Sequence, residues 1–81
     1  MKVKINNREQ EVPPGTKFVR VVTLIRDSQK DDPVTQSLIA KTGHDQITFV
    51  LNGRIIKPRE YASIEMKEGD DLRWMHPYAG G

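Results

Sequence analysis

The chain has 81 residues, with 13 basic and 11 acidic side chains and a formal net charge of +2. This length is enough for one domain, since domains usually contain about 50 to 250 residues. The absence of cysteine excludes disulfides, thiolate catalysis and thiolate metal sites. The opening segment MKVKINN lacks the apolar stretch of a signal peptide, and no apolar run is long enough to span a membrane. We therefore expect a cytoplasmic protein without a membrane partner.

The N-terminal residues show the pattern of a β-hairpin. Residues 1–5 alternate between apolar side chains and lysines, which is typical of a half-buried strand. Asn6-Asn7 favours a tight turn, because asparagine tolerates positive φ angles. Residues 8–12 return as a second strand, which Pro13-Pro14-Gly15 ends because proline cannot donate to a ladder.

A helix is predicted next, with Thr16 as its N-cap. The apolar side chains that follow recur at helical spacing, with Leu24 beside them: Phe18, Val21, Val22 and Ile25. Valines are indifferent helix formers, so this helix must pack on the sheet to be stable. A strand over residues 18–25 is the alternative.

The segment 27–46 is predicted to add a second, short helix after a polar break at residues 27–32. Asp32-Pro33 is typical of an N-cap followed by proline at the first helical position, and Gly43 of the residue that ends a helix. We expect a helix at about 33–42 with a weak apolar stripe through Val34 and Leu38.

The second half is predicted to form three strands. Residues 47–51 and 54–56 flank Asn52-Gly53, a strong hairpin signal. Residues 58–68 are expected to be irregular, with three side chains filling the core: Tyr61, Ile64 and Met66. A turn at residues 68–70 then leads into the last strand, 71–78, in which Leu72, Trp74 and His76 share one side.

This order of elements predicts an α+β domain with a mixed sheet of four to five strands packed on one main helix. The first and last strands are expected to be parallel neighbours at the centre, which is the ubiquitin-like β-grasp arrangement. An extra short helix lies in the insert 27–46. We expect a single domain over residues 1–78 and a flexible C-terminal Gly-Gly tail over residues 79–81.

Little within this domain indicates chemistry of its own. The glycine motifs that cradle nucleotides are absent, so we expect no bound cofactor. The two histidines, His44 and His76, lie in unrelated segments, and the pairs Asp31-Asp32 and Asp70-Asp71 are better explained as a helix cap and a turn. We therefore expect no metal site and no enzyme.

Basic residues gather only at the second hairpin, at Arg54, Lys57 and Arg59, where a solvated rim is expected rather than a phosphate site. The other basic residues are scattered, so we expect no nucleic-acid partner. Trp74, His76 and Tyr78 are candidate partner-docking residues, because tryptophan is over-represented among interface hot spots.

The C-terminal residues Ala79-Gly80-Gly81 are the strongest functional signal. Two glycines have no side chains and can thread a narrow channel in a partner protein. The Gly81 α-carboxylate is ionised at pH 7, since such groups titrate near 3.3–3.7. A carboxylate must be activated before a nucleophile attacks it, for instance as an acyl-adenylate, so a partner with an ATP site is required.

At these positions the sequence resembles the ThiS/MoaD family of sulfur carriers, and the thiamine-biosynthesis carriers more than the molybdopterin-synthase subunits. The Gly69-Asp70 turn and the Gly80-Gly81 end are the most specific matches. The other matching residues are Met1 to Asn7, Gly15-Thr16, Leu24-Ile25, Asn52-Gly53, Ile56, Pro58, Arg59 and Ala79. The insert 27–46 is longer than the corresponding link of a compact carrier, and Trp74 and His76 are bulkier than the aliphatic residues expected there.

The resemblance implies that this protein is a cosubstrate. A ThiF/MoeB-like adenylyltransferase would adenylate Gly81 with ATP and magnesium, and sulfur from a cysteine desulfurase or sulfurtransferase would give a thiocarboxylate. A sulfur-accepting synthase such as thiazole synthase would then receive the sulfur. By the same resemblance, Gly81 is the reactive residue, and Ala79 and Gly80 pass through the active-site channel of the partner.

The sequence leaves three alternatives open. In the first alternative, the protein is a sulfur carrier whose sulfur serves molybdopterin or cysteine/homocysteine synthesis instead of thiamine thiazole. Conjugation of Gly81 to lysines of target proteins needs the same activation chemistry. A β-grasp module that binds RNA or protein with an inert tail is the third alternative, and the sequence pI of 9.1 is its only support.

Overall fold

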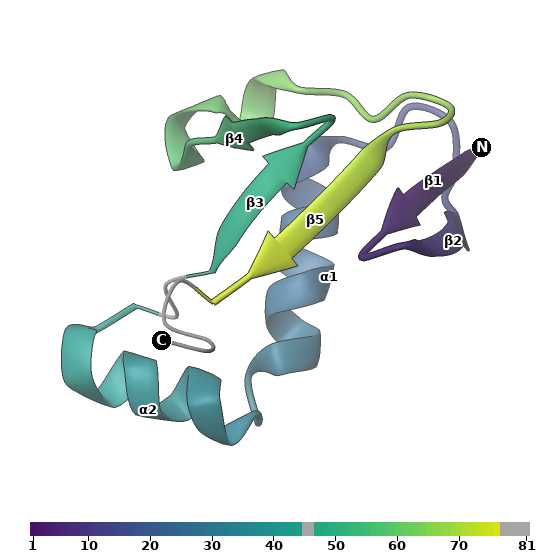
Figure 1. Ribbon diagram of the computed structural model, residues 1–81. Coiled ribbons are helices and arrows are strands. Elements are labelled where there is room, and N and C mark those ends of the chain that lie inside the picture. The colour runs from purple at the N-terminus through teal and green to yellow at the C-terminus, as the bar shows by residue number, and fades with distance from the viewer. Residues whose placement is uncertain (45–46, 77–81) are drawn as a thin grey trace.

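The computed structural model describes residues 1–44 and 47–76, which form one mixed sheet and three helical segments (Figure 1). Two strands, two α-helices and two further strands follow one another, and a 3₁₀ helix precedes the last strand, which is the order expected for the predicted α+β domain. Their bounds are β1 (Lys2–Ile5), β2 (Arg8–Glu11), α1 (Phe18–Gln29), α2 (Pro33–Thr42), β3 (Thr48–Leu51), β4 (Arg54–Ile56), the 3₁₀ helix η1 (Pro58–Ser63) and β5 (Asp71–Met75).

The five strands lie in the order β2-β1-β5-β3-β4, so the last strand occupies the centre of the sheet. β1 and β5 run parallel, with Lys4 opposite Asp71 and Ile5 opposite Leu72, and the other pairs are antiparallel. This confirms the predicted β-grasp arrangement and its central pair of parallel strands. The chain therefore leaves β5 with a strand on either side.

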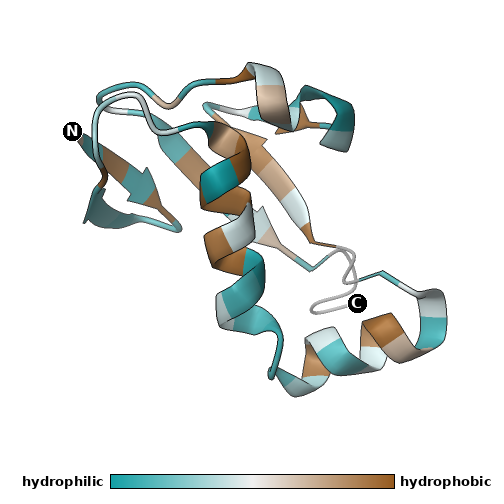
Figure 2. Ribbon diagram, turned by 180° about the vertical axis from the view of Figure 1, so that it is seen from behind, coloured by the Kyte–Doolittle hydropathy of each residue, from teal (hydrophilic) through white to brown (hydrophobic). Residues whose placement is uncertain are grey.

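The core lies between the sheet and α1, whose apolar side faces the strands (Figure 2). Phe18 of α1, Phe49 of β3 and Tyr61 of η1 form an aromatic triangle with ring centroids 5.5 to 6.1 Å apart. Phe18 and Phe49 have no solvent exposure, and Met66 is 2% exposed. Two of the three predicted core-filling side chains, Tyr61 and Met66, are thus buried, and Ile64 is partly buried.

Both hairpins turn where the sequence predicted. Asn6 and Asn7 adopt φ angles of 49° and 68°, and Asn52 and Gly53 adopt 51° and 83°. These positive values match the right-handed twist of the flanking strands, and asparagine and glycine reach them with little strain. The turn at Gly69, with φ 83°, is confirmed as well.

The predicted helix at the centre of the domain is confirmed, but its two ends are displaced. α1 begins at Phe18, and Lys17 stands at the N-cap without a side-chain hydrogen bond. Thr16 instead donates its hydroxyl to the Pro13 carbonyl at 2.6 Å, so its predicted role as N-cap is wrong. The helix also continues to Gln29 through the expected break, because four buried side chains anchor it; the alternative of a strand is wrong.

The short helix predicted inside 27–46 is confirmed as α2. Asp32 accepts hydrogen bonds from the backbone N–H groups of Val34 and Thr35, at 3.0 and 3.1 Å. Gly43 ends the helix with φ 83° and donates its N–H to Ile39. The apolar stripe differs from the prediction, because Val34 is 49% exposed while Thr35 and Leu38 are buried.

Two further boundaries differ from expectation. Residues 58–63, expected to be irregular, form the 3₁₀ helix η1, which begins at a proline and places Tyr61 in the core. β5 ends at Met75, and the predicted strand residues 77 and 78 lie outside the described residues. No helix among the described residues is long and apolar enough to cross a membrane.

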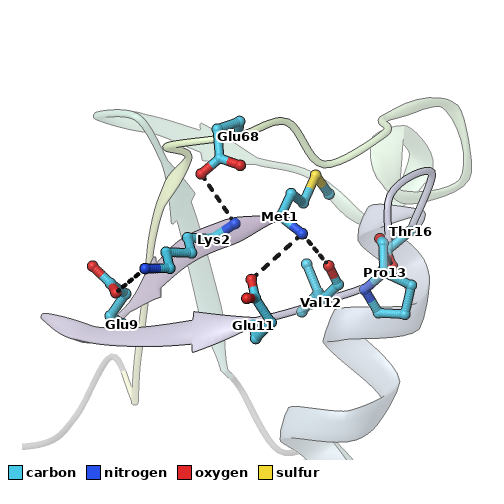
Figure 3. A network of polar contacts seen from close by, with 8 residues as sticks. All are labelled: Met1, Lys2, Glu9, Glu11, Val12, Pro13, Thr16 and Glu68. Atoms are coloured by element: carbon cyan, nitrogen blue, oxygen red, sulfur yellow. Dashed lines mark hydrogen bonds and ion pairs between the residues drawn. The ribbon is translucent and has the colours of Figure 1, made fainter.

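The edge of the sheet is tied by the chain's first residue (Figure 3). The Met1 ammonium donates to the Val12 carbonyl at 2.8 Å and lies 3.4 Å from the Glu11 carboxylate. The Lys2 backbone N–H donates to the carboxylate of Glu68, in the turn before β5, at 3.0 Å. The Met1 contacts join the two strands of the first hairpin, and the Lys2 contact holds this hairpin beside the turn that leads into β5.

Candidate functional site

The candidate site is the end of β5, from which the chain continues to the C-terminus. The predicted reactive residue Gly81, the channel residues Ala79 and Gly80 and the docking residue Tyr78 lie outside the described residues. The structure therefore describes the site through the strand that leads to it, up to His76. The contacts that hold β5 and the side chains around its last residues define this part of the site.

The C-terminal end of β5 is held by a side chain that acts as an extension of β1. The Asn6 amide oxygen accepts the Trp74 backbone N–H at 2.9 Å, and the Asn6 amide N–H₂ donates to the Trp74 carbonyl at 3.3 Å. Backbone pairing with β1 reaches Leu72, whose carbonyl accepts the Asn6 N–H. The Asn6 amide thus continues the ladder by one pair of hydrogen bonds after the backbone of β1 turns away.

The start of β5 is held in a similar way from the other hairpin. Asn52 donates its amide to the buried carboxylate of Asp70 at 2.9 Å and accepts the Asp71 backbone N–H at 2.9 Å. The same Asp70 carboxylate accepts the Lys67 backbone N–H at 2.7 Å, which closes the turn before the strand. Asn6 and Asn52 therefore bind the central strand, one at each end. The turn signals predicted these asparagines, but not their contacts with β5.

Trp74 and His76 point to the same side of β5 as the buried Leu72, as predicted. Trp74 is partly buried and packs against the core, and its ring meets the His76 ring edge-on at 6.0 Å and 90°. Met75, on the opposite side, is 47% exposed. Partner docking through Trp74 and His76 stays a prediction.

His76 also reaches a residue that sequence reasoning did not single out. Its Nε2 lies 3.2 Å from the hydroxyl of Thr35 on α2, a side chain with only 2% exposure. Its Nδ1 is buried and has no hydrogen-bond partner within residues 1–44 and 47–76. No periodic or motif signal marks Thr35, because the two residues are 41 positions apart and only the fold brings them together.

The remaining acidic and histidine residues serve local structure. Asp32 caps α2, Asp70 closes a turn, and Asp71 lies 3.7 Å from Arg73. His44 is exposed, and its backbone is hydrogen-bonded to the Thr42 hydroxyl. In the part of the chain that the structure describes, no three His, Asp or Glu side chains are placed to hold a metal ion.

The basic residues at the second hairpin are divided between a salt bridge and a cleft. Arg54 lies 2.8 Å from the Glu60 carboxylate, which also accepts the Lys57 backbone N–H at 2.9 Å. The Arg54 hydrogen bond, followed by the Lys57 N–H, holds the pKa of Glu60 below its ordinary value of 4.5. Lys57 and Arg26 line an open cleft of about 430 Å³ between α1, the hairpin and η1. Within the domain, the Glu60 carboxylate compensates the charge of Arg54.

Comparisons with known proteins agree with the architecture. No family model and no curated protein matches the sequence. Among solved structures, the chain is similar to the thiamine biosynthesis protein ThiS from Geobacter metallireducens, with a TM-score of 0.67 over 100% of both chains at 16% identity. At this identity the likeness concerns the fold, and it confirms the predicted resemblance at that level. This chain has the β-grasp fold of the thiamine biosynthesis protein ThiS.

Proposed function

We propose that this protein is a sulfur carrier whose C-terminal Gly81 is converted to a thiocarboxylate by partner enzymes. The observation that carries the proposal is the end-to-end match in fold to a thiamine biosynthesis protein, combined with a central strand that leads into Ala79-Gly80-Gly81. Neither feature alone is specific, since β-grasp domains serve many functions and Gly-Gly is a common dipeptide.

The proposed chemistry begins at the Gly81 carboxylate. One carboxylate oxygen attacks the α-phosphorus of ATP, pyrophosphate leaves, and the product is an acyl-adenylate. The terminal sulfur of a cysteine persulfide on a desulfurase or sulfurtransferase then displaces AMP and gives an acyl disulfide. A thiolate attacks the persulfide-derived cysteine sulfur of this acyl disulfide, so the thiocarboxylate leaves and a disulfide remains on the sulfur donor. ATP and magnesium are bound by the adenylyltransferase, and this chain contributes the tail and the surface that presents it. It is a cosubstrate and not an enzyme.

The donated sulfur would go to a synthase in cofactor biosynthesis, with thiamine thiazole as the first expectation. The partner's channel must admit Ala79 and Gly80 in extended form, so small side chains are required at these positions. The contacts of Asn6 and Asn52 support this role, because they hold both ends of β5, the strand that precedes the tail.

The test is the intact mass of the protein purified from its own host without reductant or a C-terminal tag. We expect a species heavier by one sulfur-for-oxygen exchange, with the change localised to Gly81. Reconstitution with ATP, magnesium, cysteine, a desulfurase, the adenylyltransferase and a thiol reductant should produce the same species. An unshifted mass under both conditions would contradict the proposal.

Substitutions in the tail give a second test of the proposal. Deletion of Gly81, or Gly81→Ala with its additional methyl group, should abolish thiocarboxylate formation without lowering the melting temperature. Gly53→Ala is a suitable control: Gly53 lies in the β3–β4 turn, near the other end of β5, and its φ of 83° makes alanine costly. This control should lose stability and keep thiocarboxylate formation.

A further inference from the structure

A single hydrogen bond joins the added helix α2 to the last described residue before the tail. The Thr35 hydroxyl and the His76 Nε2 are 3.2 Å apart. Thr35 is 2% exposed, so its hydroxyl has no access to bulk water as an alternative partner. A buried hydroxyl that loses its hydrogen bond is destabilising, which favours keeping this contact.

Among the described residues, little else holds α2 in place. Only Thr35 and Leu38 of its ten residues are buried, and neither belongs to the core cluster between α1 and the sheet. The capping contacts of Asp32 and Gly43 are local and would persist if the helix moved as a unit. Figure 1 shows α2 beyond the end of the sheet where β5 finishes, away from the main core.

The His76 ring contacts two side chains, Trp74 and Thr35. It meets the Trp74 ring edge-on, and the Trp74 backbone is held by the Asn6 amide. Its Nε2 meets the Thr35 hydroxyl. Because Nδ1 is buried and has no hydrogen-bond partner among the described residues, Nε2 is the ring atom through which the imidazole makes a hydrogen bond there. Rotation of the ring away from Thr35 would break the hydrogen bond between Nε2 and the Thr35 hydroxyl.

The Thr35–His76 contact lies directly after the last residue of β5 that pairs within the sheet. The last residue of β5 paired in the sheet is Met75, opposite Thr48 of β3. His76 follows directly, and only its side chain makes a described contact beyond that point. We propose that Thr35 and His76 are positioning residues, which use α2 to set the point and direction in which the chain leaves β5 towards Gly81.

The inference rests on the proposed function, because positioning matters only if a partner takes up the tail. A partner that threads the tail must order its residues, and each ordered residue costs conformational entropy. When the residue at the base of the tail is already fixed in the free protein, that part of the cost is not incurred on binding. Loss of the Thr35–His76 bond should therefore weaken recognition and leave the chemical step unchanged.

The test compares three variants on the same helix. Thr35→Val keeps the shape of the side chain and removes the hydroxyl, whereas Thr35→Ser keeps the hydroxyl. Thr42→Val is the matched control, because its hydroxyl bonds Leu38 and His44 and does not touch His76. Should Thr35→Val fail to fold, His76→Phe retains an aromatic ring beside Trp74 and lacks Nε2.

The first readout needs no partner enzyme. ¹⁵N NMR of the His76 imidazole should show one dominant tautomer in the parent protein, in Thr35→Ser and in Thr42→Val, and a changed tautomer ratio in Thr35→Val. Amide hydrogen exchange in α2 should become faster in Thr35→Val than in Thr35→Ser. An identical imidazole spectrum in Thr35→Val would show that the hydrogen bond does not form, and would overturn the inference.

The second readout is steady-state adenylation of Gly81 by the adenylyltransferase of the same organism. Thr35→Val should raise KM for the carrier about five- to tenfold, the cost of ordering about one more backbone residue, with kcat unchanged and Thr35→Ser near normal. An unchanged KM beside a changed imidazole spectrum would overturn the positioning role. If the parent protein itself is never adenylated, the proposed function fails, and the imidazole result distinguishes that failure from this one.

Discussion

The two α-helices of this protein are stabilised in opposite ways. α1 has no side-chain hydrogen bond at its N-cap and contains several valines, yet it buries four apolar side chains against the sheet. α2 has a capping aspartate, a proline at its first position and a glycine at its end, yet it buries only Thr35 and Leu38. Tertiary packing therefore stabilises α1, whereas local hydrogen bonds define α2.

This difference determines which helix can unfold locally. A helix held by the core cannot move without unfolding the domain, since interiors are closely packed. A helix outside the core cluster can open locally at a lower free energy. We therefore expect α1 to unfold only with the whole domain, and α2 to open separately from it.

The largest effect is expected for Phe18→Ala in α1. Phe18 is fully buried and contacts Phe49 and Tyr61, so removing its ring should cost about 3–5 kcal/mol of the free energy of unfolding. Urea denaturation followed by Trp74 fluorescence would measure the loss. Val19→Ala, at a neighbouring position with 39% exposure, should change stability by about 0.5 kcal/mol or less. Equal losses in the two variants would refute the importance of packing for α1.

A smaller and more local effect is expected for Leu38→Ala in α2. Leu38 is 8% exposed, and its loss should cost about 2 kcal/mol, the lower end of the range for leucine truncation. In the parent protein the α2 amides should exchange with a lower opening free energy than those at the centre of the sheet, and Leu38→Ala should lower it further. Ile39→Ala is the control, because Ile39 is 44% exposed. If the α2 amides of the parent protein exchange at the same opening free energy as those of α1, the two helices unfold together and the comparison fails.

The next prediction concerns the helix caps. Asp32→Ala removes both hydrogen bonds to the first turn of α2 and should cost about 1 kcal/mol. Thr16→Ala, just before α1, should cost less, because the Thr16 hydroxyl bonds the Pro13 carbonyl at an exposed site and does not cap the helix. Hydrogen exchange at the amides of Val34 and Thr35 would report the local change. A larger loss for Thr16→Ala would reverse the assignment of the two caps.

The smallest effect is expected at the third helical segment, η1, which begins beside the carboxylate of Glu60. Because the pKa of Glu60 is lowered in the folded protein, the ionised form stabilises the fold. This contribution is present above the ordinary pKa of 4.5 and is lost as the pH falls through the lower, folded pKa. Carboxyl ¹³C NMR titration would locate the transition.

Two substitutions test the cause of that shift. Arg54→Gln removes the hydrogen bond that contributes most, so the pKa of Glu60 should rise towards its ordinary value. Arg59→Gln, which removes only a weak charge interaction, should raise it less. If Arg59→Gln has the larger effect, the charge around η1 and not the salt bridge sets the titration of Glu60.

The features that the sequence predicted well are those whose causes lie within a few residues. The turns at Asn6-Asn7 and Asn52-Gly53, the cap at Asp32-Pro33 and the helix end at Gly43 each follow from local backbone preferences. The alternation of β5 and the order of elements then predicted the β-grasp topology, since few arrangements bury all the apolar faces. Short-range preferences and the order of elements therefore suffice for these parts of the fold.

The errors and omissions share the opposite cause. The start of α1 depended on Phe18 reaching a core built by Phe49 and Tyr61, so the nearby Thr16 was a misleading signal. η1 places Tyr61 in that same core, and the expectation of an irregular segment missed its helical turn.

The surroundings of the candidate site were decided in the same way. The sequence by itself determined that a strand leads into Ala79-Gly80-Gly81 and that a capped helix lies between residues 33 and 42. Only the tertiary structure decided that Asn6 continues the ladder of β5 and that Thr35 meets His76. Hydrogen bonds between residues 41 or 68 positions apart leave no periodic trace, because they arise from the packing of whole elements and not from the preferences of neighbouring residues.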